Sequence, residues 1–321
     1  MKKLKISTLW CGDISQSVIF SLIKFIAQKD IEFVHPSEAE IIFFGPYDLL
    51  SFKRRSYNYF KKRYKIIGKV FPNLDLYLLN RKIKPIRIFF SHENTFSPDI
   101  YYDFSITSQF NIHDETHLRF PIWKDLIDWS HLGFVRAPTK FVNRFDNFYN
   151  INQLTKPLGN EYIKKKRNIC IFSTHLKEPR KSMRYFFSKN FRVDGYGPYF
   201  DTNIENHNSS IFSKKSILQQ YAFNLCPENS LYPGYYTEKV PEAFLGKSLP
   251  LTWADPNIKL DFNENSFINL FHYFHDDYYK ISNLLKDEIF LKKFTYEPLL
   301  LSKPNLDLEY KFIEKVLKSV N

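Results

Sequence analysis

The segment 223–239 carries the densest group of chemically useful side chains in this chain. It begins as a short apolar run, continues as a loop with tyrosine, proline and glycine, and then predicts a helix with Thr237 as its N-cap. The free N–H groups and positive dipole end of a helix start favour phosphate, and Lys239 adds a full charge there. This order predicts a site for an anionic ligand that carries a sugar or a nucleotide. The polar members are Glu228, Asn229, Tyr235, Thr237, Glu238 and Lys239.

The helix start also has an ordinary interpretation. Glu238 and Lys239 would then only complement the helix dipole or face solvent. The Glu228 and Asn229 pair before the loop, and the two tyrosines within it, favour the functional interpretation.

Short apolar runs that alternate with helix-like stretches must position this segment. We predict strands at 4–9, 31–34, 40–44, 86–90, 102–107, 168–173, 192–197 and 248–253. We predict helices at 17–27, 180–188, 216–221, 240–245 and 306–316. Strands separated by helices favour parallel sheets, and the polar stretch 136–166 separates two such halves. We therefore expect an α/β protein with a Rossmann-like domain at 1–150, a second at 151–305 and an amphipathic helix at 306–321.

The composition indicates a globular protein with an anionic partner. The chain has 321 residues, a net charge of +12 and 44% hydrophobic residues. Nucleic acid, anionic lipid and a nucleotide-diphosphate substrate all fit that charge. A basic cluster at 54–65 predicts a solvated helix face first and contact with an anionic membrane surface second. No nucleic-acid module accompanies it, so we expect no nucleic-acid partner.

The three cysteines are widely spaced and form neither a disulfide framework nor a CxxC metal motif. The start of the chain lacks the apolar run of a signal peptide, and no apolar stretch reaches the ~18 residues of a membrane span. We therefore expect a cytoplasmic protein, with peripheral contact at the inner face of the membrane as an extension.

Residues 221–253 resemble the signature of the α-1,3/1,4-fucosyltransferases, glycosyltransferase family 10. The family pattern reads approximately F-x-L-x-F-E-N-S, then Y-x-T-E-K, a short helix and a P-x-x-W strand. The matching residues are Phe223, Leu225, Glu228, Asn229, Ser230, Tyr235, Thr237, Glu238, Lys239, Pro250 and Trp253. Pro227 stands where the family usually has phenylalanine, a departure that bears on the shape of the donor-sugar pocket.

Arg180 and the later run Val193 to Gly197 resemble the family's R…VD-x-YG segment. The resemblance implies that Arg180 and Lys239 bind the donor diphosphate. It also implies a nucleoside and sugar site formed by Val193, Asp194, Tyr196, Gly197, Glu228, Asn229, Tyr235, Thr237 and Glu238.

In the first half, Phe90 to Asn94 resembles the family's strand-end x-x-E-N, and Arg119 to Trp123 resembles its R-x-P stretch. The resemblance implies that Glu93 is the general base. His92, Asn94 and Arg119 would then lie on the acceptor side.

The resemblance implies a GT-B-like fold, in which two Rossmann-type domains face each other across a cleft. It further implies an inverting transfer of L-fucose from GDP-β-L-fucose to a glycan of N-acetyllactosamine type, as in bacterial surface polysaccharides such as lipopolysaccharide O-antigen. Basic residues would stabilise the leaving diphosphate, and the chain has no D-x-D triplet. We therefore expect neither a metal nor another cofactor.

Three alternatives stay open. The donor could be a different GDP-sugar. From another class of protein, the chain could bind nucleic acid or an anionic surface. The weakest alternative is a zinc hydrolase, because His113 and His117 have the spacing of a metal-binding helix face but lack the glutamate and third ligand of that motif.

Overall fold

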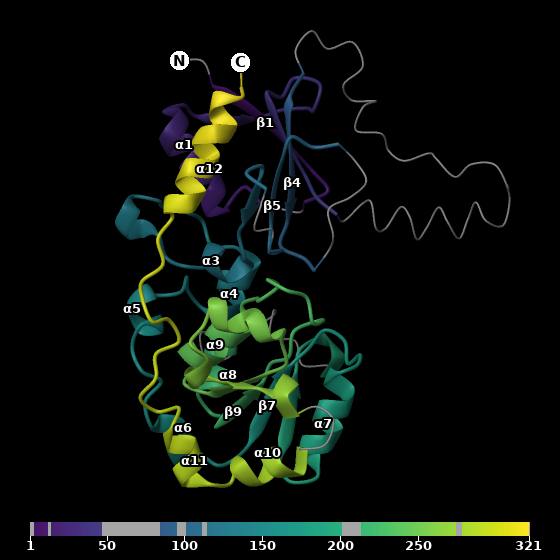
Figure 1. Cartoon of the computed structure of the whole chain (residues 1–321), viewed down its shortest axis with the longest axis vertical. Helices are drawn as coiled ribbons and strands as arrows, with labels where there is room; N and C mark the ends of the chain where they lie inside the picture. The colour runs from purple at the N-terminus through teal and green to yellow at the C-terminus, as the bar shows by residue number, and fades with distance from the viewer. Residues whose placement is uncertain are drawn as a thin grey trace, which may run out of the picture. The chain divides into compact units, whose positions relative to one another are not determined.

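The computed structural model describes residues 3–11, 14–46, 84–94, 101–110, 114–200, 213–273 and 278–320. The basic cluster at 54–65 and His113 lie outside the described residues. The chain divides into two units, each built on one parallel sheet (Figure 1). The first unit contains residues 1–120, 134–136 and 306–321, and the second contains residues 121–133 and 137–305.

The first unit is a six-stranded sheet in the order β2-β1-β3-β4-β5-β6, and all its pairs are parallel. The strands are β1 (Leu4–Leu9), β2 (Ile31–Phe33), β3 (Ile41–Phe44), β4 (Ile86–Ser91), β5 (Phe104–Thr107) and β6 (His117–Arg119). The central strand β3 is buried on both faces, as expected of an unbroken apolar run in a covered parallel sheet. The predicted strands of this half are therefore confirmed.

Helices α1 (Val18–Ala27) and α12 (Asp307–Lys318) pack side by side in the first unit, although they come from opposite ends of the chain (Figure 1). Ser17 caps α1, because its side chain accepts a hydrogen bond from the Ile19 N–H at 3.3 Å. Phe20 of α1 lies 5.0 Å from Phe43, and Phe312 of α12 lies 5.7 Å from Phe104, between ring centroids. The C-terminal helix is thus part of the first unit rather than a separate appendage.

The second unit is a five-stranded parallel sheet in the order β11-β10-β9-β7-β8. Its strands are β7 (Ile169–Phe172), β8 (Val193–Tyr196), β9 (Phe223–Leu225), β10 (Leu249–Thr252) and β11 (Ile268–Asn269). Its α-helices are α3 (Ile122–Asp125), α4 (Lys140–Phe145), α5 (Ile151–Leu154), α6 (Glu161–Lys164), α7 (Arg180–Ser188), α8 (Lys214–Leu218), α9 (Lys239–Leu245), α10 (Tyr278–Leu284) and α11 (Glu288–Lys292). Its 3₁₀ helices are η2 (Ser130–Leu132), η3 (Pro198–Phe200), η5 (Pro256–Leu260), η6 (Glu264–Ser266) and η7 (Leu270–Tyr273).

Two differences from the predicted boundaries are the largest. The helix expected at 216–221 begins at Lys214 and ends at Leu218, because the Ser213 side chain caps it by accepting from the Ser216 N–H. The second unit begins at Pro121 rather than near residue 150. Trp123 explains this early start, because its indole N–H donates to Asp261 at 2.8 Å within the second unit.

Candidate active site in the second unit

The order of strands in the second sheet creates a ligand-binding position. The chain runs from β7 outward to β8 and then returns to place β9 on the other side of β7. The connections therefore diverge between β7 and β9, and the crevice beyond the carboxyl ends of such strands is where open α/β sheets bind ligands. Ser173 follows β7 at this point, and Glu228 follows β9.

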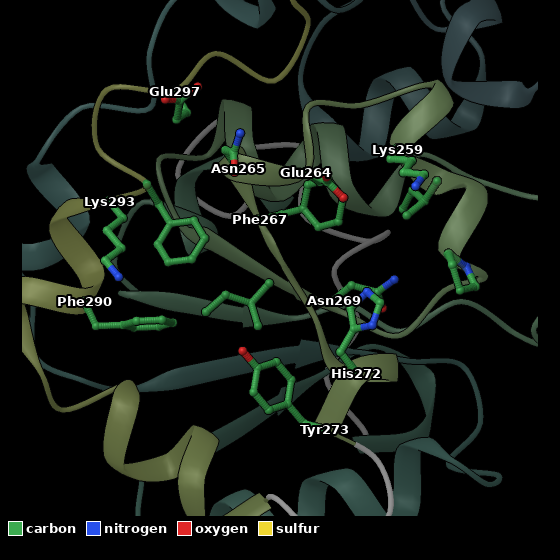
Figure 2. Close-up of a pocket in the computed structure, with 14 residues that line it drawn as sticks. Lys259, Glu264, Asn265, Phe267, Asn269, His272, Tyr273, Phe290, Lys293 and Glu297 are labelled. Atoms are coloured by element: carbon green, nitrogen blue, oxygen red, sulfur yellow. The ribbon is translucent and has the colours of Figure 1, made fainter.

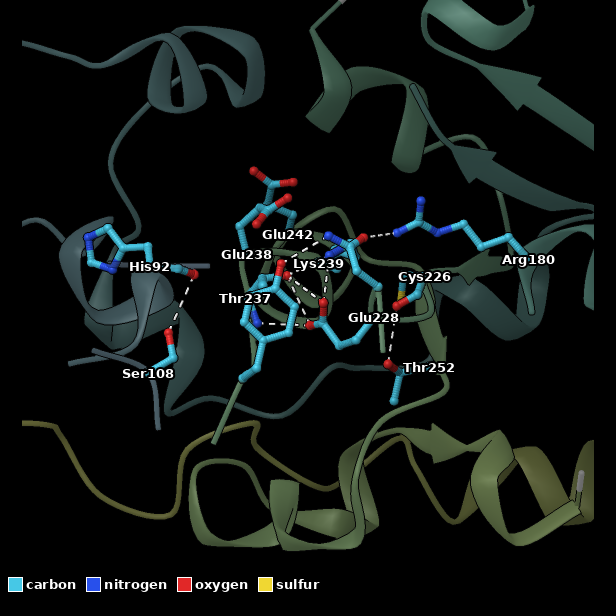
Figure 3. A network of polar contacts seen from close by, with 12 residues as sticks. His92, Ser108, Arg180, Cys226, Glu228, Thr237, Glu238, Lys239, Glu242 and Thr252 are labelled. Carbon is cyan, nitrogen blue, oxygen red and sulfur yellow. Dashed lines mark hydrogen bonds and ion pairs between the residues drawn. The ribbon is translucent and has the colours of Figure 1, made fainter. Parts of the chain in front are cut away.

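Glu228 lies at the centre of a buried hydrogen-bond network (Figure 3). Its side chain is 1% exposed, and its Oε1 accepts from the Thr237 N–H at 2.8 Å and from the Thr237 hydroxyl at 2.9 Å. Its Oε2 lies 2.6 Å from the Lys239 Nζ. These donors offset the free-energy cost of burying the Glu228 carboxylate. The carboxylate in turn holds the loop and the start of α9 in place.

The expectation that Thr237 is the N-cap of this helix is wrong. Helix α9 begins at Lys239 with Glu238 as its N-cap, and no side chain caps it. The Thr237 N–H and hydroxyl are both bonded to Glu228. Glu228 thus accepts from the N–H of Thr237, the residue that the sequence predicted as the N-cap of a phosphate-binding helix start.

Arg180 is the buried cation at the start of α7. It is 7% exposed and donates to the Asn229 Oδ1, and its Nη1 lies 3.1 Å from the His175 Nδ1. Asn229 in turn donates from Nδ2 to the Tyr235 hydroxyl at 3.0 Å. Burial lowers the pKa of Arg180, against the opposing effect of Glu228, Tyr235 and Glu238. This chain of contacts joins α7 to the loop after β9.

Lys239 keeps its charge within this network. Burial acts to lower the pKa of its ammonium, but the negative charges of Glu228 and Glu238 outweigh that effect and raise it. Lys239 also lies 2.8 Å from the Thr237 hydroxyl. Hydrogen bonds join Arg180 to Asn229 and Asn229 to Tyr235, and the Lys239 Nζ lies 6.0 Å from the Tyr235 ring centroid, so the two groups of contacts are neighbours.

Glu238 faces a second set of positive charges. Its Oε1 lies 3.6 Å from the Arg144 guanidinium, and its side chain is 12% exposed. Burial acts to raise the pKa of Glu238, but Lys239, Lys214 and Arg144 outweigh it and bring the pKa to about 2. Glu238 is therefore ionised throughout the physiological pH range.

A buried ion pair anchors helix α9 one turn further on. Lys214 and Glu242 are 5% and 0% exposed, and they form a salt bridge. Tyr149 donates to the other oxygen of Glu242 at 3.1 Å. These contacts connect α8 and the residues before α5 to α9, which carries Lys239 at its start. Such an arrangement fixes the position of α9 relative to the sheet.

The predicted nucleoside residues lie on and after the edge strand β8. Asp194 accepts from the Tyr221 hydroxyl at 2.8 Å, and the Tyr196 and Tyr221 hydroxyls lie 2.6 Å apart. Val193 begins the strand and is half-buried. Gly197 has φ +103°, and a Cβ there would lie 2.8 Å from the Ser173 carbonyl oxygen, so only glycine fits this turn.

Pro227 is buried between two residues that pair with β10. The Cys226 and Glu228 N–H groups donate to the Leu251 and Trp253 carbonyls, so the backbone nitrogen between them points away from β10. Proline is tolerated there because that nitrogen donates no ladder bond to β10. Because proline has no backbone N–H, Pro227 also offers one donor fewer at the end of β9 than another residue would.

The tentative acceptor residues gather at the carboxyl ends of β4, β5 and β6 in the first unit. The Ser108 hydroxyl donates to the His92 carbonyl at 3.4 Å, and the Ser108 carbonyl accepts from the Arg119 Nε at 3.1 Å. Glu93 follows β4 and donates its N–H to the Ser91 hydroxyl at 3.1 Å. Asn94 follows it and is half-buried. Ser108 therefore connects His92 to Arg119, and Glu93 and Asn94 follow His92 directly in the chain.

His117 does not lie on a helix face. It is part of strand β6, and its ring nitrogens lie 2.9 Å from the Ser105 hydroxyl and 2.9 Å from the Gln109 carbonyl. Within the parts of the chain that the structure describes, no three His, Cys, Asp or Glu side chains are grouped as metal ligands. The helical zinc motif is therefore wrong for His117.

Sequence reasoning missed several residues of this network. His175 was detectable, because it follows β7 just as Glu228 follows β9. Arg144, Tyr149, Lys214 and Glu242 carried no local signal. Each contributes through a partner between 28 and 94 positions away in the chain.

The structure defines the class of fold. The chain is an α/β protein with two parallel Rossmann-type sheets, and Arg180 and Lys239 lie near the switch point of the second sheet. Residues 162–294 match the model of the C-terminal domain of glycosyltransferase family 10 (fucosyltransferase). The resemblance noted in the motifs is confirmed over this part of the chain.

Proteins of similar sequence bear fucosyltransferase names. Alpha-(1,3)-fucosyltransferase FucT of Helicobacter pylori is 26% identical over 200 residues, which are 57% of this chain and 40% of that protein. A putative fucosyltransferase R654 of Acanthamoeba polyphaga mimivirus is 29% identical over 118 residues, or 34% of this chain and 20% of that protein. The chain thus spans less than half the length of these curated relatives.

Crystal structures of an alpha1,3-fucosyltransferase share the fold at 21% identity, over 99% of this chain and 90% of that one. The TM-score is 0.64 for its complex with GDP-fucose and 0.61 for its complex with GDP. Among the described helices of the present chain, none is long and apolar enough to cross a bilayer.

Proposed function

We propose that this chain is an inverting glycosyltransferase that moves L-fucose from GDP-β-L-fucose to a hydroxyl group of a glycan. The observation that carries the proposal is the contact network of Arg180, Asn229, Thr237 and Lys239 at the β7–β9 switch point. It lies within the residues that match family 10, and relatives of this chain bear fucosyltransferase names.

Arg180 and Lys239 are the proposed diphosphate ligands. Arg180 is buried and Lys239 is half-buried, and fixed cations stabilise the negative charge that builds on a departing diphosphate. Lys239 is paired with Glu228, so Arg180 is the stronger candidate for the first contact with the diphosphate. Glu228 then acts as a positioning residue that orients Thr237 and Lys239. The donor's nucleoside and sugar are assigned to Val193, Asp194, Tyr196, Gly197, Asn229, Tyr235 and Glu238.

Glu93 is the proposed general base. It would take the proton from the acceptor hydroxyl as that oxygen attacks the anomeric carbon of fucose. The bond between that carbon and the diphosphate oxygen breaks, and GDP departs with the electron pair. A single displacement inverts the anomeric centre, so a β-linked donor yields an α-fucoside, through a transition state with oxocarbenium character. The mechanism requires the two units to bring Glu93 to the donor.

We propose that the reaction needs no metal ion. The chain has no D-x-D triplet, and the charges of Arg180 and Lys239 supply the stabilisation that a divalent ion gives elsewhere. The expected acceptor is a glycan of N-acetyllactosamine type, such as a lipopolysaccharide O-antigen or another bacterial surface polysaccharide. The resemblance to the family suggests a cytoplasmic enzyme, and the net charge of +12 supports contact with the anionic inner face of the membrane.

A panel of GDP-sugars tests the donor. GDP-fucose should be consumed faster than GDP-mannose and faster than UDP-sugars in the presence of N-acetyllactosamine. Pro227 supports the second candidate, a transferase for another GDP-sugar, and preferential turnover of such a sugar would establish it. Tight, salt-sensitive RNA binding without stabilisation by GDP would instead indicate a nucleic-acid-binding protein.

A further inference from the structure

A pocket lies along the edge strand β11 of the second unit (Figure 2). Its volume is about 730 Å³. It is lined by residues of η5, η6 and β11, by the residues after β11 and by α11 with the turns that follow it. A pocket of this size is within the range that binds small organic ligands.

Aromatic rings form much of the pocket wall. Phe290 and Phe294 lie 5.4 Å apart between ring centroids, at an interplanar angle of 70°. Phe267 is almost completely buried, and Tyr273 directs its side chain toward the interior of the pocket in Figure 2. The half-buried rings of Phe290, Phe294 and Tyr273 can present apolar faces to a ligand, and the tyrosine adds a hydroxyl that can donate and accept.

Charges of both signs balance around the pocket. Lys259 and Lys293 line it together with Glu264 and Glu297. The Glu297 Oε2 accepts from the Asn263 Nδ2 at 2.9 Å, and the Lys293 Nζ lies 5.7 Å from the Phe290 ring centroid. This balance contrasts with the net charge of +12 of the whole chain. It disfavours nucleotides and phosphates and favours a neutral ligand with many hydroxyl groups.

A saccharide has this chemistry. The C–H faces of its rings can pack on aromatic side chains, and its hydroxyls can bond to the lysine, glutamate, asparagine and tyrosine groups among the lining residues. We propose that the β11 pocket binds a neutral oligosaccharide, as an accessory site for sugar units of the acceptor remote from the reacting hydroxyl. The identification of that oligosaccharide as the acceptor rests on the proposed function.

The pocket is separate from the donor site. Neither Arg180, Glu228 nor Lys239 lines it. Strand β11 lies two positions from β9 in the sheet, at the edge opposite β8. Changes in the pocket can therefore be tested without removing a donor ligand.

The experiment measures binding of a neutral tetrasaccharide that contains N-acetyllactosamine, by calorimetry and by saturation-transfer NMR. Phe290→Ala should weaken that binding about tenfold, as expected when a central aromatic contact is removed. The matched control is Tyr296→Ala, because Tyr296 is a 75% exposed aromatic nearby in sequence that does not line the pocket. The control should bind like the wild type, and the Kd for GDP should be unchanged in both variants.

A second variant guards against loss of fold. Lys293 is exposed, so Lys293→Gln should keep the wild-type melting temperature and still weaken binding of the tetrasaccharide several-fold. The inference is overturned if neither Phe290→Ala nor Lys293→Gln weakens binding more than the control does, or if the wild type does not bind the tetrasaccharide. Failure of the proposed function has a different readout, namely no transfer from GDP-fucose. Pocket-dependent saccharide binding in such a protein would still support the site.

Discussion

The Lys239 Nζ lies 2.6 Å from the Glu228 Oε2, so the lysine and the first acid of the motif form a salt bridge with each other. Glu228 is 1% exposed and Lys239 is 17% exposed. The acid thereby aligns the cation that the proposed mechanism uses, and it bonds to Thr237 in the same geometry. Within the motif from Glu228 to Lys239, Glu228 therefore positions Thr237 and Lys239.

Replacing Glu228 should cost stability as well as activity. Glu228→Gln leaves Lys239 buried without its charged partner, and we expect the free energy of unfolding to fall by roughly 3 kcal/mol. Urea denaturation measures this change. Glu264→Gln, at an exposed glutamate, is the control and should change it little. A loss below ~1 kcal/mol for Glu228→Gln, as for a surface ion pair, would contradict the role assigned to Glu228.

Arg180 should control affinity for the donor. Arg180→Ala removes a buried guanidinium that is hydrogen-bonded to Asn229, and we expect the Kd for GDP to rise by about 10- to 100-fold. Lys181 is exposed on the same helix, so Lys181→Ala is the matched control and should keep the Kd within about twofold. Isothermal titration of both variants with GDP gives the result. Equal affinities would remove Arg180 from the diphosphate site.

Glu238 should make the stability of the protein depend on acid pH. Its pKa is about 2 in the folded protein and 4.5 in the unfolded chain, so its contribution is fully present above pH 4.5 and is lost as the pH falls toward 2. Glu238→Gln should therefore show a shallower decline of unfolding free energy over this interval, by roughly 3 kcal/mol in total. Chemical denaturation at pH 6, 4 and 3 measures the slope. Parallel curves for the two proteins would contradict the low pKa.

Replacing Glu93 should lower turnover without changing the affinity for GDP. Glu93→Gln keeps the size of the side chain but removes the base, and we expect kcat to fall by about 10²- to 10⁴-fold with the Kd for GDP unchanged. Single-turnover kinetics with saturating acceptor separates the two effects. Near-normal kcat in this variant would show that another group accepts the proton.

Local pattern predicted much of this fold. The apolar runs of β1, β3 and β4 and the periodic faces of α1 and α7 are visible in sequence, because parallel strands are buried on both faces and helices on one. The placement of α12 beside α1 was not visible. A helical period shows which face is apolar but does not name the partner that covers it.

The candidate site also has residues that the sequence predicted and residues that it did not. The motif was readable because Glu228, Thr237 and Lys239 are close in sequence. The N-cap was predicted wrongly because a threonine before a helix is usually a cap, and only the folded chain shows that Glu228 has bonded to its hydroxyl. The support that Lys214 and Tyr149 give to Glu242 depends on contacts across 28 and 93 positions, which no local rule contains.

The product of the reaction tests the central claim most directly. Purified protein is incubated with GDP-β-L-fucose labelled with ¹³C at C1, N-acetyllactosamine and EDTA, and the anomeric signal is followed by NMR. The proposed function predicts a new α-fucoside signal that grows with the release of GDP, at a rate that EDTA does not change. A β-linked product, hydrolysis to free fucose without transfer, or an unchanged donor would contradict it.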